Sequence, residues 1–181
     1  MQIMKEKEMP QKIAAVPQKK NEKSKKIVLA ADPMGAVLKN VIKKHLQSEG
    51  YEVIDYGTDC AENFVTYFEI SAKAAKAIQQ GVADKGIVFC GTGVGVGITA
   101  NKFKGIYCGM VDSDFAAGQC KVINNCNMLA MGGWLISETK AIMAVDNWLN
   151  KKFNEGTPEQ FVKIVEDGVA GIAKIEDNNF K

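Results

Sequence analysis

A cysteine directly precedes a glycine-rich turn in the segment FCGTGVGVGITANK, residues 89–102. Glycine at every second position lets the backbone approach a ligand closely and point its N–H groups at anionic oxygens. A helix-like stretch follows, and its N-terminus adds positive potential that favours the thiolate form of Cys90. A thiolate beside such a turn suits proton abstraction next to a carbonyl group. The spacing equally allows Cys90 to be a core residue above a tight strand-to-helix connection.

The turn does not reproduce the common nucleotide-binding fingerprints. The pattern GxGxxG fails in two frames, where Val96 and Ile98 replace the last glycine, and a third frame ends in Ala100. The fingerprint also follows the first strand of its domain, whereas this turn follows the third expected strand. No GKS or GKT sequence is present, which excludes a Walker A loop. The turn therefore indicates a site for an anion or an oxyanion.

The composition narrows the possible functions. The chain has 181 residues, of which 46% are hydrophobic and 24% charged, as is usual for one globular domain. Its net charge is +2, and much of the positive charge lies in the first 26 residues, so we expect no nucleic-acid partner. No apolar run approaches the ~18 residues that span a membrane. Arginine is absent, which excludes a bidentate guanidinium clamp on a phosphate.

Histidine and cysteine usage excludes further classes of protein. The single histidine, His45, follows two lysines and is predicted to be a solvated surface residue. A mechanism that needs several histidines from one chain is therefore excluded. The five cysteines form no CxxC pair, which indicates free thiols in a reducing compartment. We expect a cytoplasmic protein without a metal site.

The order of elements predicts the fold class. Residues 1–25 are expected to form a disordered basic tail, and residues 26–181 a single α/β domain. The expected strands are 26–31, 51–57, 85–90, 106–111 and 127–133, and the expected helices are 36–50, 69–81, 97–105, 112–125, 137–153 and 157–176. Their strict alternation predicts a three-layer α/β/α sandwich around a five-stranded parallel sheet, of the flavodoxin or Rossmann-like type.

Some side chains have an expected structural role. The first helix is predicted to turn one apolar face inward, formed by Val37, Leu38, Val41, Ile42 and Leu46. Three methionines in expected strands are predicted to be core residues: Met110, Met128 and Met131. Ser137 and Thr157 are predicted helix N-caps, and Pro158 follows the second of them.

Three polar side chains fall at or just past the ends of expected strands, namely Asp32, Cys90 and Asp112. In open α/β sheets, ligands bind outside the carboxyl ends of the strands. All three are therefore placed for function by architecture alone. An aspartate at the start of a helix is also a common N-cap, which leaves two interpretations of Asp112 and makes Asp114 a first-turn acid.

The sequence resembles the family of ribose-5-phosphate isomerase B and galactose-6-phosphate isomerase from about Lys26 to Ile175. The resemblance rests on AADPMG, GYEVIDYGT, Tyr67 followed by AAKAI, GIVFCGTGVGVGITANKFKGI and INNCNMLAMGG. It implies an aldose–ketose isomerase of carbohydrate metabolism, as in the pentose phosphate pathway, that acts on a sugar or sugar phosphate through a cis-enediol. It implies no metal or organic cofactor. It also implies a homodimer or homotetramer whose active sites are built across the subunit interface.

The resemblance extends to individual residues. Cys90 is implied to be the base that moves a proton between C1 and C2, with Thr92 and Asp32 in the same catalytic group. The backbone of Gly91, Gly93 and Gly95 is implied to hold the developing enediolate. Further candidates for contact with the sugar are Tyr67, Asn101, Asn124, Asp112 and Trp134.

Five positions depart from the pattern of the family. Histidines that follow the family's aspartate and precede its asparagine are replaced by Pro33 and Ile123. Family arginines, two of which bind the substrate phosphate, are replaced by Thr157, Phe161 and Trp134. The residues for proton transfer are thus kept, whereas those for opening the sugar ring and clamping a phosphate are absent.

These departures leave three interpretations open. In the first, the protein isomerises a different substrate: an unphosphorylated sugar, a short sugar phosphate that is already open-chain, or a modified sugar. Asp112 or Asp114 would then replace histidine, and Trp134 and Phe161 would favour a less charged ligand. In the second, lysines hold a phosphate, with Lys104, Lys151 and Lys152 as candidates. The third is a catalytically inactive sugar-binding or regulatory protein, which needs no cysteine beside the turn.

Overall fold

The computed structural model describes residues 25–60 and 62–180, so all but Lys25 of the expected tail lies outside the described residues. The strands are β1 (Lys26–Ala31), β2 (Glu52–Asp55), β3 (Lys85–Cys90), β4 (Cys108–Met110) and β5 (Met128–Gly132). The helices are α1 (Ala36–Ser48), α2 (Tyr67–Gln79), α3 (Val94–Ala100), α4 (Asp114–Asn124), α5 (Glu138–Asn150) and α6 (Glu159–Asn179).

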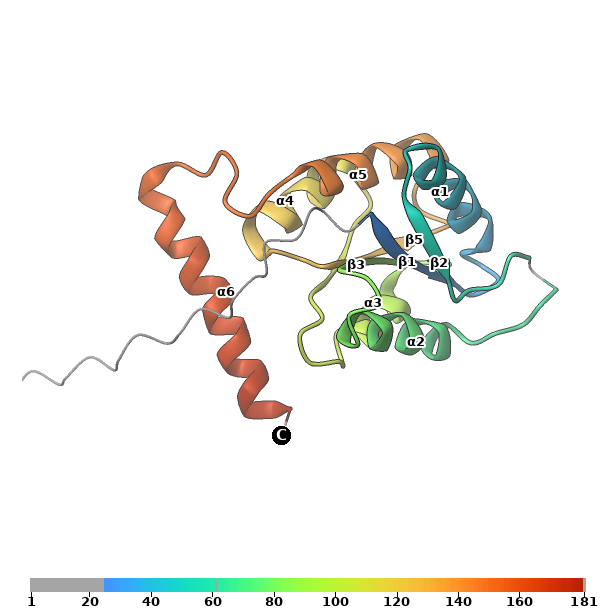
Figure 1. Cartoon of the computed structure of the whole chain (residues 1–181), viewed down its shortest axis with the longest axis horizontal. Helices are drawn as coiled ribbons and strands as arrows, with labels where there is room; N and C mark the ends of the chain where they lie inside the picture. The colour runs from blue at the N-terminus through green and yellow to red at the C-terminus, as the bar shows by residue number, and fades with distance from the viewer. Residues whose placement is uncertain (1–24, 61, 181) are drawn as a thin grey trace, which may run out of the picture.

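The five strands form one parallel sheet in the order β2-β1-β3-β5-β4. Helices α1, α4 and α5 cover one face, and α2 and α3 cover the other (Figure 1). Because helices lie on both faces, β1 and β3 are apolar and buried after their first residue, a lysine in each, and β5 is buried at every position. The three-layer α/β/α prediction is therefore confirmed.

One core layer is built around Phe89, Leu129 and Trp148, on the side of α1, α4 and α5. The other is built around Val88 and Ile70 on the side of α2 and α3. Since each layer buries side chains from the same central strands, the carboxyl ends of β1, β3 and β5 are held in a fixed relation. That edge of the sheet carries the candidate site.

Several local predictions need correction. Helix α3 begins at Val94 rather than at residue 97, because Gly93 has φ +79° and turns the chain directly into the helix. The N-cap of α4 is Ser113, whose side chain accepts a hydrogen bond from the Ala116 N–H, so Asp112 is not the cap. Thr157 is not a cap either, because α6 starts after Pro158 with no side-chain cap bond. Ser137 is confirmed as the N-cap of α5.

Burial corrects three further predictions. Met110 is 57% exposed because it ends the edge strand β4, whereas Met128 and Met131 are buried as predicted. Val37 is 71% exposed, so it does not belong to the inward face of α1. His45 is not a solvated residue: it is half-buried, and its Nε2 lies 2.7 Å from Asp146 Oδ1 of α5.

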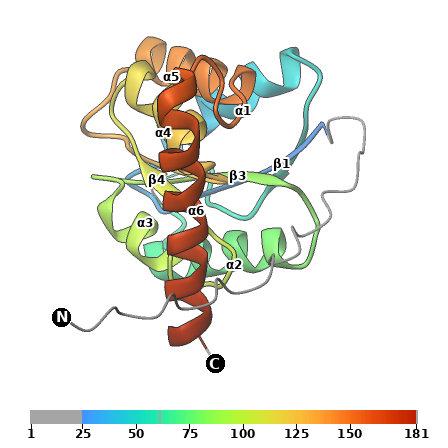
Figure 2. The same cartoon turned by 90° about the vertical axis from the view of Figure 1, so that its left-hand side faces the viewer.

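Helix α6 projects from the body of the domain (Figures 1 and 2). None of its residues, all of which lie in the described part of the chain, is buried. Near its end, Glu176 accepts hydrogen bonds from the Gly105 N–H at 2.7 Å and the Tyr107 hydroxyl at 3.0 Å. Four large apolar side chains along it are exposed: Phe161, Ile164, Ile172 and Ile175. Within residues 25–60 and 62–180, no helix is long and apolar enough to cross a membrane.

Candidate active site

Cys90 is the last residue of β3, in the middle of the sheet. Its side chain is almost covered, with 6% of the residue exposed. The Gly93 N–H donates a hydrogen bond to Cys90 Sγ at 3.1 Å, which holds the sulfur against the glycine-rich turn. The thiol is therefore oriented by the same turn that offers N–H groups to a ligand.

Two aromatic rings lie directly against this turn. A Cβ on Gly91 would stand 2.8 Å from three carbon atoms of the Trp134 ring, and one on Gly95 would stand 2.8 Å from the Tyr67 ring. Only glycine fits under either ring without displacing it. Trp134 is 67% exposed and Tyr67 44% exposed, so the outer surface of each side chain is open to solvent. The rings flank the turn and suit contact with the carbon-bound hydrogens of a sugar.

Asp32 follows β1 and lies beside Cys90. Its N–H donates to the Phe89 carbonyl at 3.3 Å, and its Oδ1 accepts from the N–H groups of Met34 and Gly35 at 2.9 and 3.0 Å. None of the hydrogen bonds found among the described residues uses Oδ2, which leaves that oxygen for a ligand hydroxyl. Burial raises the pKa of Asp32, and the two backbone hydrogen bonds oppose this rise.

A second carboxylate stands at the same edge of the sheet. Asp112 and Thr92 line a small cavity of about 100 Å³, together with residues at the ends of β4 and β5. Since Ser113 rather than Asp112 caps α4, the Asp112 carboxylate does not bind the N–H groups at the start of that helix. Thr92 Oγ1 accepts a hydrogen bond from the Val94 N–H at 3.3 Å. The structure thus brings Asp112 to the turn that carries Cys90.

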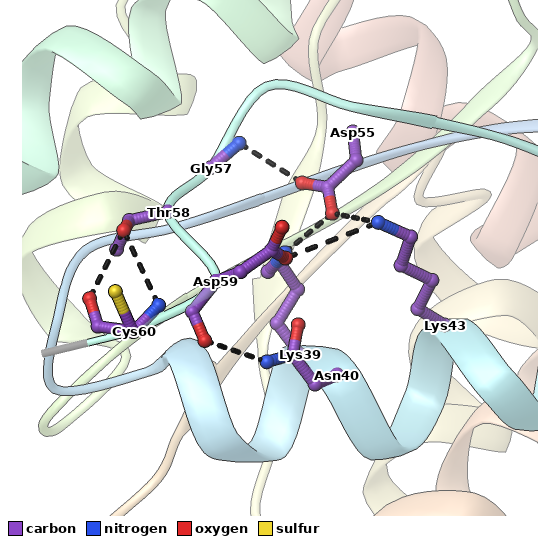
Figure 3. Close-up of polar contacts among 8 residues, drawn as sticks. All are labelled: Lys39, Asn40, Lys43, Asp55, Gly57, Thr58, Asp59 and Cys60. Atoms are coloured by element: carbon purple, nitrogen blue, oxygen red, sulfur yellow. Dashed lines mark hydrogen bonds and ion pairs between the residues drawn. The ribbon is translucent and has the colours of Figure 1, made fainter. Parts of the chain in front are cut away.

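A buried lysine that the sequence did not reveal supports the same edge. Lys39 of α1 is fully buried, and its ammonium contacts Asp55 and, at 2.7 Å, Asp59 (Figure 3). Lys43 also binds Asp55, at 2.9 Å. These contacts fix the segment from Asp55 to Asp59, in which the Thr58 N–H donates to the Ala31 carbonyl at 3.0 Å. The end of β1, immediately before Asp32, is thereby tied to α1.

Two predicted site residues lie away from Cys90. Asn101 follows α3, and its side chain binds both the N–H and the carbonyl of Cys108, at 2.8 and 2.9 Å. It therefore fastens the start of β4 at the amino edge of the sheet. Asn124 is the exposed last residue of α4, which runs back toward that same edge. One chain alone does not bring either asparagine to the thiol.

A second cavity, of about 280 Å³, lies near Asn124. Its lining includes Ile123, Thr157, Phe161 and Glu155. The Glu155 carboxylate accepts from Lys151 Nζ at 2.9 Å, and this ion pair lowers the pKa of Glu155. Most of the residues that line the cavity are apolar. The lysine beside it, Lys151, is already paired with a carboxylate.

The fold is a parallel α/β sandwich with a cysteine at the carboxyl edge of its sheet, held against a glycine-rich turn. Residues 27–165 match the Ribose/Galactose Isomerase family. The chain is 34% identical over 156 residues to the 4-deoxy-4-sulfo-D-erythrose isomerase of Clostridium sp. (strain MSTE9), with 86% of this chain and 98% of that protein covered. It is 38% identical over 141 residues to ribose-5-phosphate isomerase B of Escherichia coli, covering 78% and 94%.

A third relative is the D-erythrulose-4-phosphate isomerase of Pectobacterium atrosepticum, 33% identical over 130 residues, with 72% of this chain and 86% of that protein covered. Among solved structures, ribose-5-phosphate isomerase B of Clostridium thermocellum matches with a TM-score of 0.77 and 35% identity, covering 84% of this chain and 98% of that chain. The chain belongs to the Ribose/Galactose Isomerase family. Its reaction class is the interconversion of aldoses and ketoses.

Proposed function

We propose that the protein isomerises an open-chain sugar by moving a proton between C1 and C2 through a cis-enediol, with Cys90 as the base. The observation that carries this proposal is the position of the Cys90 sulfur, 3.1 Å from the Gly93 nitrogen at the foot of the glycine-rich turn. A thiolate held there removes a proton from the carbon beside the carbonyl and returns it to the neighbouring carbon. We place this reaction in the cytoplasm, because the five cysteines are free thiols.

Each neighbouring group has a part in this reaction. Backbone N–H groups between Gly91 and Gly95, other than those of Gly93 and Val94 that bind Cys90 Sγ and Thr92 Oγ1, stabilise the negative oxygen of the enediolate. Asp32 Oδ2 accepts a hydrogen bond from a sugar hydroxyl, and the rings of Tyr67 and Trp134 limit where the carbon chain lies. The Thr92 hydroxyl and the Asp112 carboxylate stand where they can exchange protons with the oxygens on C1 and C2.

The substrate we favour has four carbons and cannot form a ring. Pro33 and Ile123 occupy the positions of the family histidines, and neither side chain can carry a proton. A four-carbon sugar whose C4 bears a phosphate ester or a sulfonate has no C4 hydroxyl with which to close a five-membered ring. Two relatives are named for such substrates, a 4-deoxy-4-sulfo-erythrose and an erythrulose 4-phosphate. Such a substrate needs no ring-opening group.

The anionic group on C4 then needs a cation other than arginine. Two of the candidate lysines already bind carboxylates, Lys104 with Asp177 at 2.7 Å and Lys151 with Glu155 at 2.9 Å. The side chain of Lys152 makes no ion pair with any described residue. We therefore assign Lys152 as the point charge for the C4 group. Lys152→Ala should raise KM for anionic substrates more than it lowers kcat.

The complete site is proposed to form between two copies of the chain. Asn124 and the cavity beside Ile123 lie at the amino edge of the sheet, opposite Cys90. Phe161 lines that cavity from the projecting helix α6, whose apolar side chains have no partner among the described residues that buries them. In a symmetric dimer, the same pair of surfaces is used twice, so each Cys90 meets the Asn124 of the other copy.

An exchange experiment tests the proposed reaction. The protein is incubated in D2O with D-erythrose 4-phosphate, D-erythrulose 4-phosphate, 4-deoxy-4-sulfo-D-erythrose and, as a cyclising comparison, ribose 5-phosphate. The wild-type protein should incorporate deuterium at C1 or C2 of the four-carbon sugars. Cys90→Ala should slow this incorporation by about 10²-fold or more. Cys60→Ala, which removes another free thiol, is the matched control and should keep full exchange. Binding of these sugars without exchange by the wild-type protein would instead establish a catalytically inactive sugar-binding protein.

A mixing experiment tests the shared site separately. Chains with Cys90→Ala and chains with Asn124→Ala are each purified, unfolded together and refolded. In mixed dimers one of the two sites has both residues intact, so random pairing should restore about a quarter of the wild-type activity. Recovery no greater than the sum of the two separate variants would place the whole site within one chain.

A further inference from the structure

Two of the cysteines gather on the face of the sheet covered by α4, and a third, Cys108, lies nearby in the core layer on the opposite face. Cys108 lies in β4, Cys120 in α4, and Cys126 in the turn that follows α4. A Cβ on Gly109 would stand 3.0 Å from the Cys120 sulfur and 3.5 Å from the Cys126 sulfur. Both sulfur atoms therefore point into the one space that this glycine leaves open. Cys108 is not among the nearest contacts of that space.

The backbone brings the same two residues together. Helix α4 ends in a left-handed residue, Asn125, with φ 51°, which turns the chain back on itself. The Cys126 N–H then donates to the Cys120 carbonyl at 3.1 Å. A hydrogen bond between these two groups holds the α-carbons within about 7 Å, the range in which a disulfide closes without backbone movement.

The two thiols also differ in acidity. The interaction with the Cys120 thiol lowers the pKa of Cys126, burial opposes this by raising it, and the neighbouring Lys121 ammonium lowers it. The same interaction raises the pKa of Cys120. Burial raises the pKa of Cys108, so that thiol stays protonated. No group of three or more metal-ligating side chains that could hold an ion occurs within the described ranges.

We propose that Cys120 and Cys126 form a reversible disulfide when a peroxide is the oxidant. The Cys126 thiolate attacks one oxygen of hydrogen peroxide, the O–O bond breaks, and hydroxide leaves, so Cys126 becomes a sulfenic acid. The Cys120 sulfur then attacks the Cys126 sulfur, the S–O bond breaks, and a second hydroxide leaves with the Cys120 proton as water. The two thiols lose two electrons, and the peroxide accepts them. A thiol reductant reverses the change.

The new bond would bracket Ile123 and Asn124, the residues at the end of α4 that are proposed to complete the active site. Oxidation would therefore hold this segment in one conformation and lower the activity, and reduction would restore it. This consequence rests on the proposed function, whereas the disulfide itself does not. A reduced protein with no activity on any sugar would refute the proposed function and leave the cysteine chemistry to be measured by itself.

Mass spectrometry tests the disulfide in the full native chain. After treatment with hydrogen peroxide, free thiols are alkylated and the protein is digested with trypsin. Since cleavage follows lysine, residues 105–121 carry Cys108 and Cys120, and residues 122–140 carry Cys126. We expect these two peptides to be linked, with the joint loss of two alkylatable thiols, and to separate on reduction. The link should persist in Cys108→Ala and disappear in Cys120→Ser.

Three results would overturn the proposal. The first is a link that forms only when the protein is unfolded in urea before oxidation. The second is a link that persists in Cys120→Ser through Cys108. The third is conversion of Cys126 to a sulfinic acid with Cys120 still alkylatable. The wild-type protein alone decides the first and third results, so the test does not depend on the folding of a variant.

Discussion

Removal of the buried ammonium of Lys39 is expected to destabilise the fold far more than removal of its neighbour Lys43. Both lysines bind Asp55, but Lys39 is fully buried, whereas the side chain of Lys43 is 30% exposed (Figure 3). Lys39→Met keeps the length of the side chain and leaves Asp55, only 11% exposed, with fewer partners. Breaking a buried ion pair from one side costs about 3–5 kcal/mol.

The lower end of that range applies here. Asp55 keeps Lys43 at 2.9 Å and the Gly57 N–H at 2.9 Å, and Asp59, the second partner of Lys39, is already 69% exposed. We therefore expect a loss of about 3 kcal/mol for Lys39→Met. Lys43→Met removes a partly exposed pair and should cost about 0–1 kcal/mol.

Urea unfolding followed by circular dichroism at 222 nm measures both variants, at one fixed protein concentration so that association does not confuse the comparison. With a slope of about 2 kcal/mol/M, the midpoint should fall by roughly 1.5 M for Lys39→Met and by less than about 0.5 M for Lys43→Met. Equal midpoints for the two variants would refute the reasoning, because burial would then make no difference to the value of the charge.

Three further predictions concern the candidate site. Gly91→Ala should leave stability nearly unchanged, because the exposed Trp134 ring can move, whereas Gly93→Ala should cost at least about 1–2 kcal/mol, because φ is +79° and the new Cβ would stand 2.9 Å from the Met131 backbone carbon. Thermal unfolding separates the two variants, and the reverse order of stability would contradict these contacts. Asn101→Ala should lower the unfolding free energy by about 1–3 kcal/mol and leave kcat unchanged, because the Cys108 backbone loses its two hydrogen bonds to the Asn101 side chain. A large loss of kcat with normal stability would instead give Asn101 a catalytic role. Asp32→Asn keeps the Oδ1 acceptor and removes a carboxyl group whose pKa is raised by burial, so the variant should be more stable than the wild type at neutral pH. This difference in stability should vanish as the pH falls through the pKa of Asp32, and a difference that does not change with pH would contradict the prediction.

The topology was predictable from sequence because it depends on local pattern. Each strand is a short apolar run, each helix is amphipathic, and their alternation admits little but a parallel sheet with helices on both faces. The position of Cys90 and Asp32 at one edge follows from the same rule, since Cys90 ends β3 and Asp32 directly follows the parallel strand β1. The confirmed predictions thus concern features that are determined by the local sequence of one strand, helix or turn.

The features that escaped prediction depend on two segments at once. Lys39 is buried because the carboxylates of Asp55 and Asp59 lie against its ammonium, and no periodicity within the helix encodes that. Asn101 likewise hydrogen-bonds the Cys108 backbone across the turn between α3 and β4, a contact between two segments that neither segment encodes alone. Only the departures from the family pattern, such as Ile123 in place of a polar side chain, indicate from sequence alone that distant segments meet at the site.

The two tryptophans of the chain stand in opposite surroundings. Trp148 is fully buried, with its indole N–H donating to the Cys126 carbonyl at 3.3 Å, whereas Trp134 is 67% exposed and rests on Gly91 of the turn. Their fluorescence should therefore separate into a short-wavelength component that follows folding and a long-wavelength component that would report a ligand bound at the proposed site on the turn. Because Trp134 needs no label, a library of sugars can be screened by the quenching or blue shift of the second component alone. The protein thus carries its own optical readout for finding its ligand.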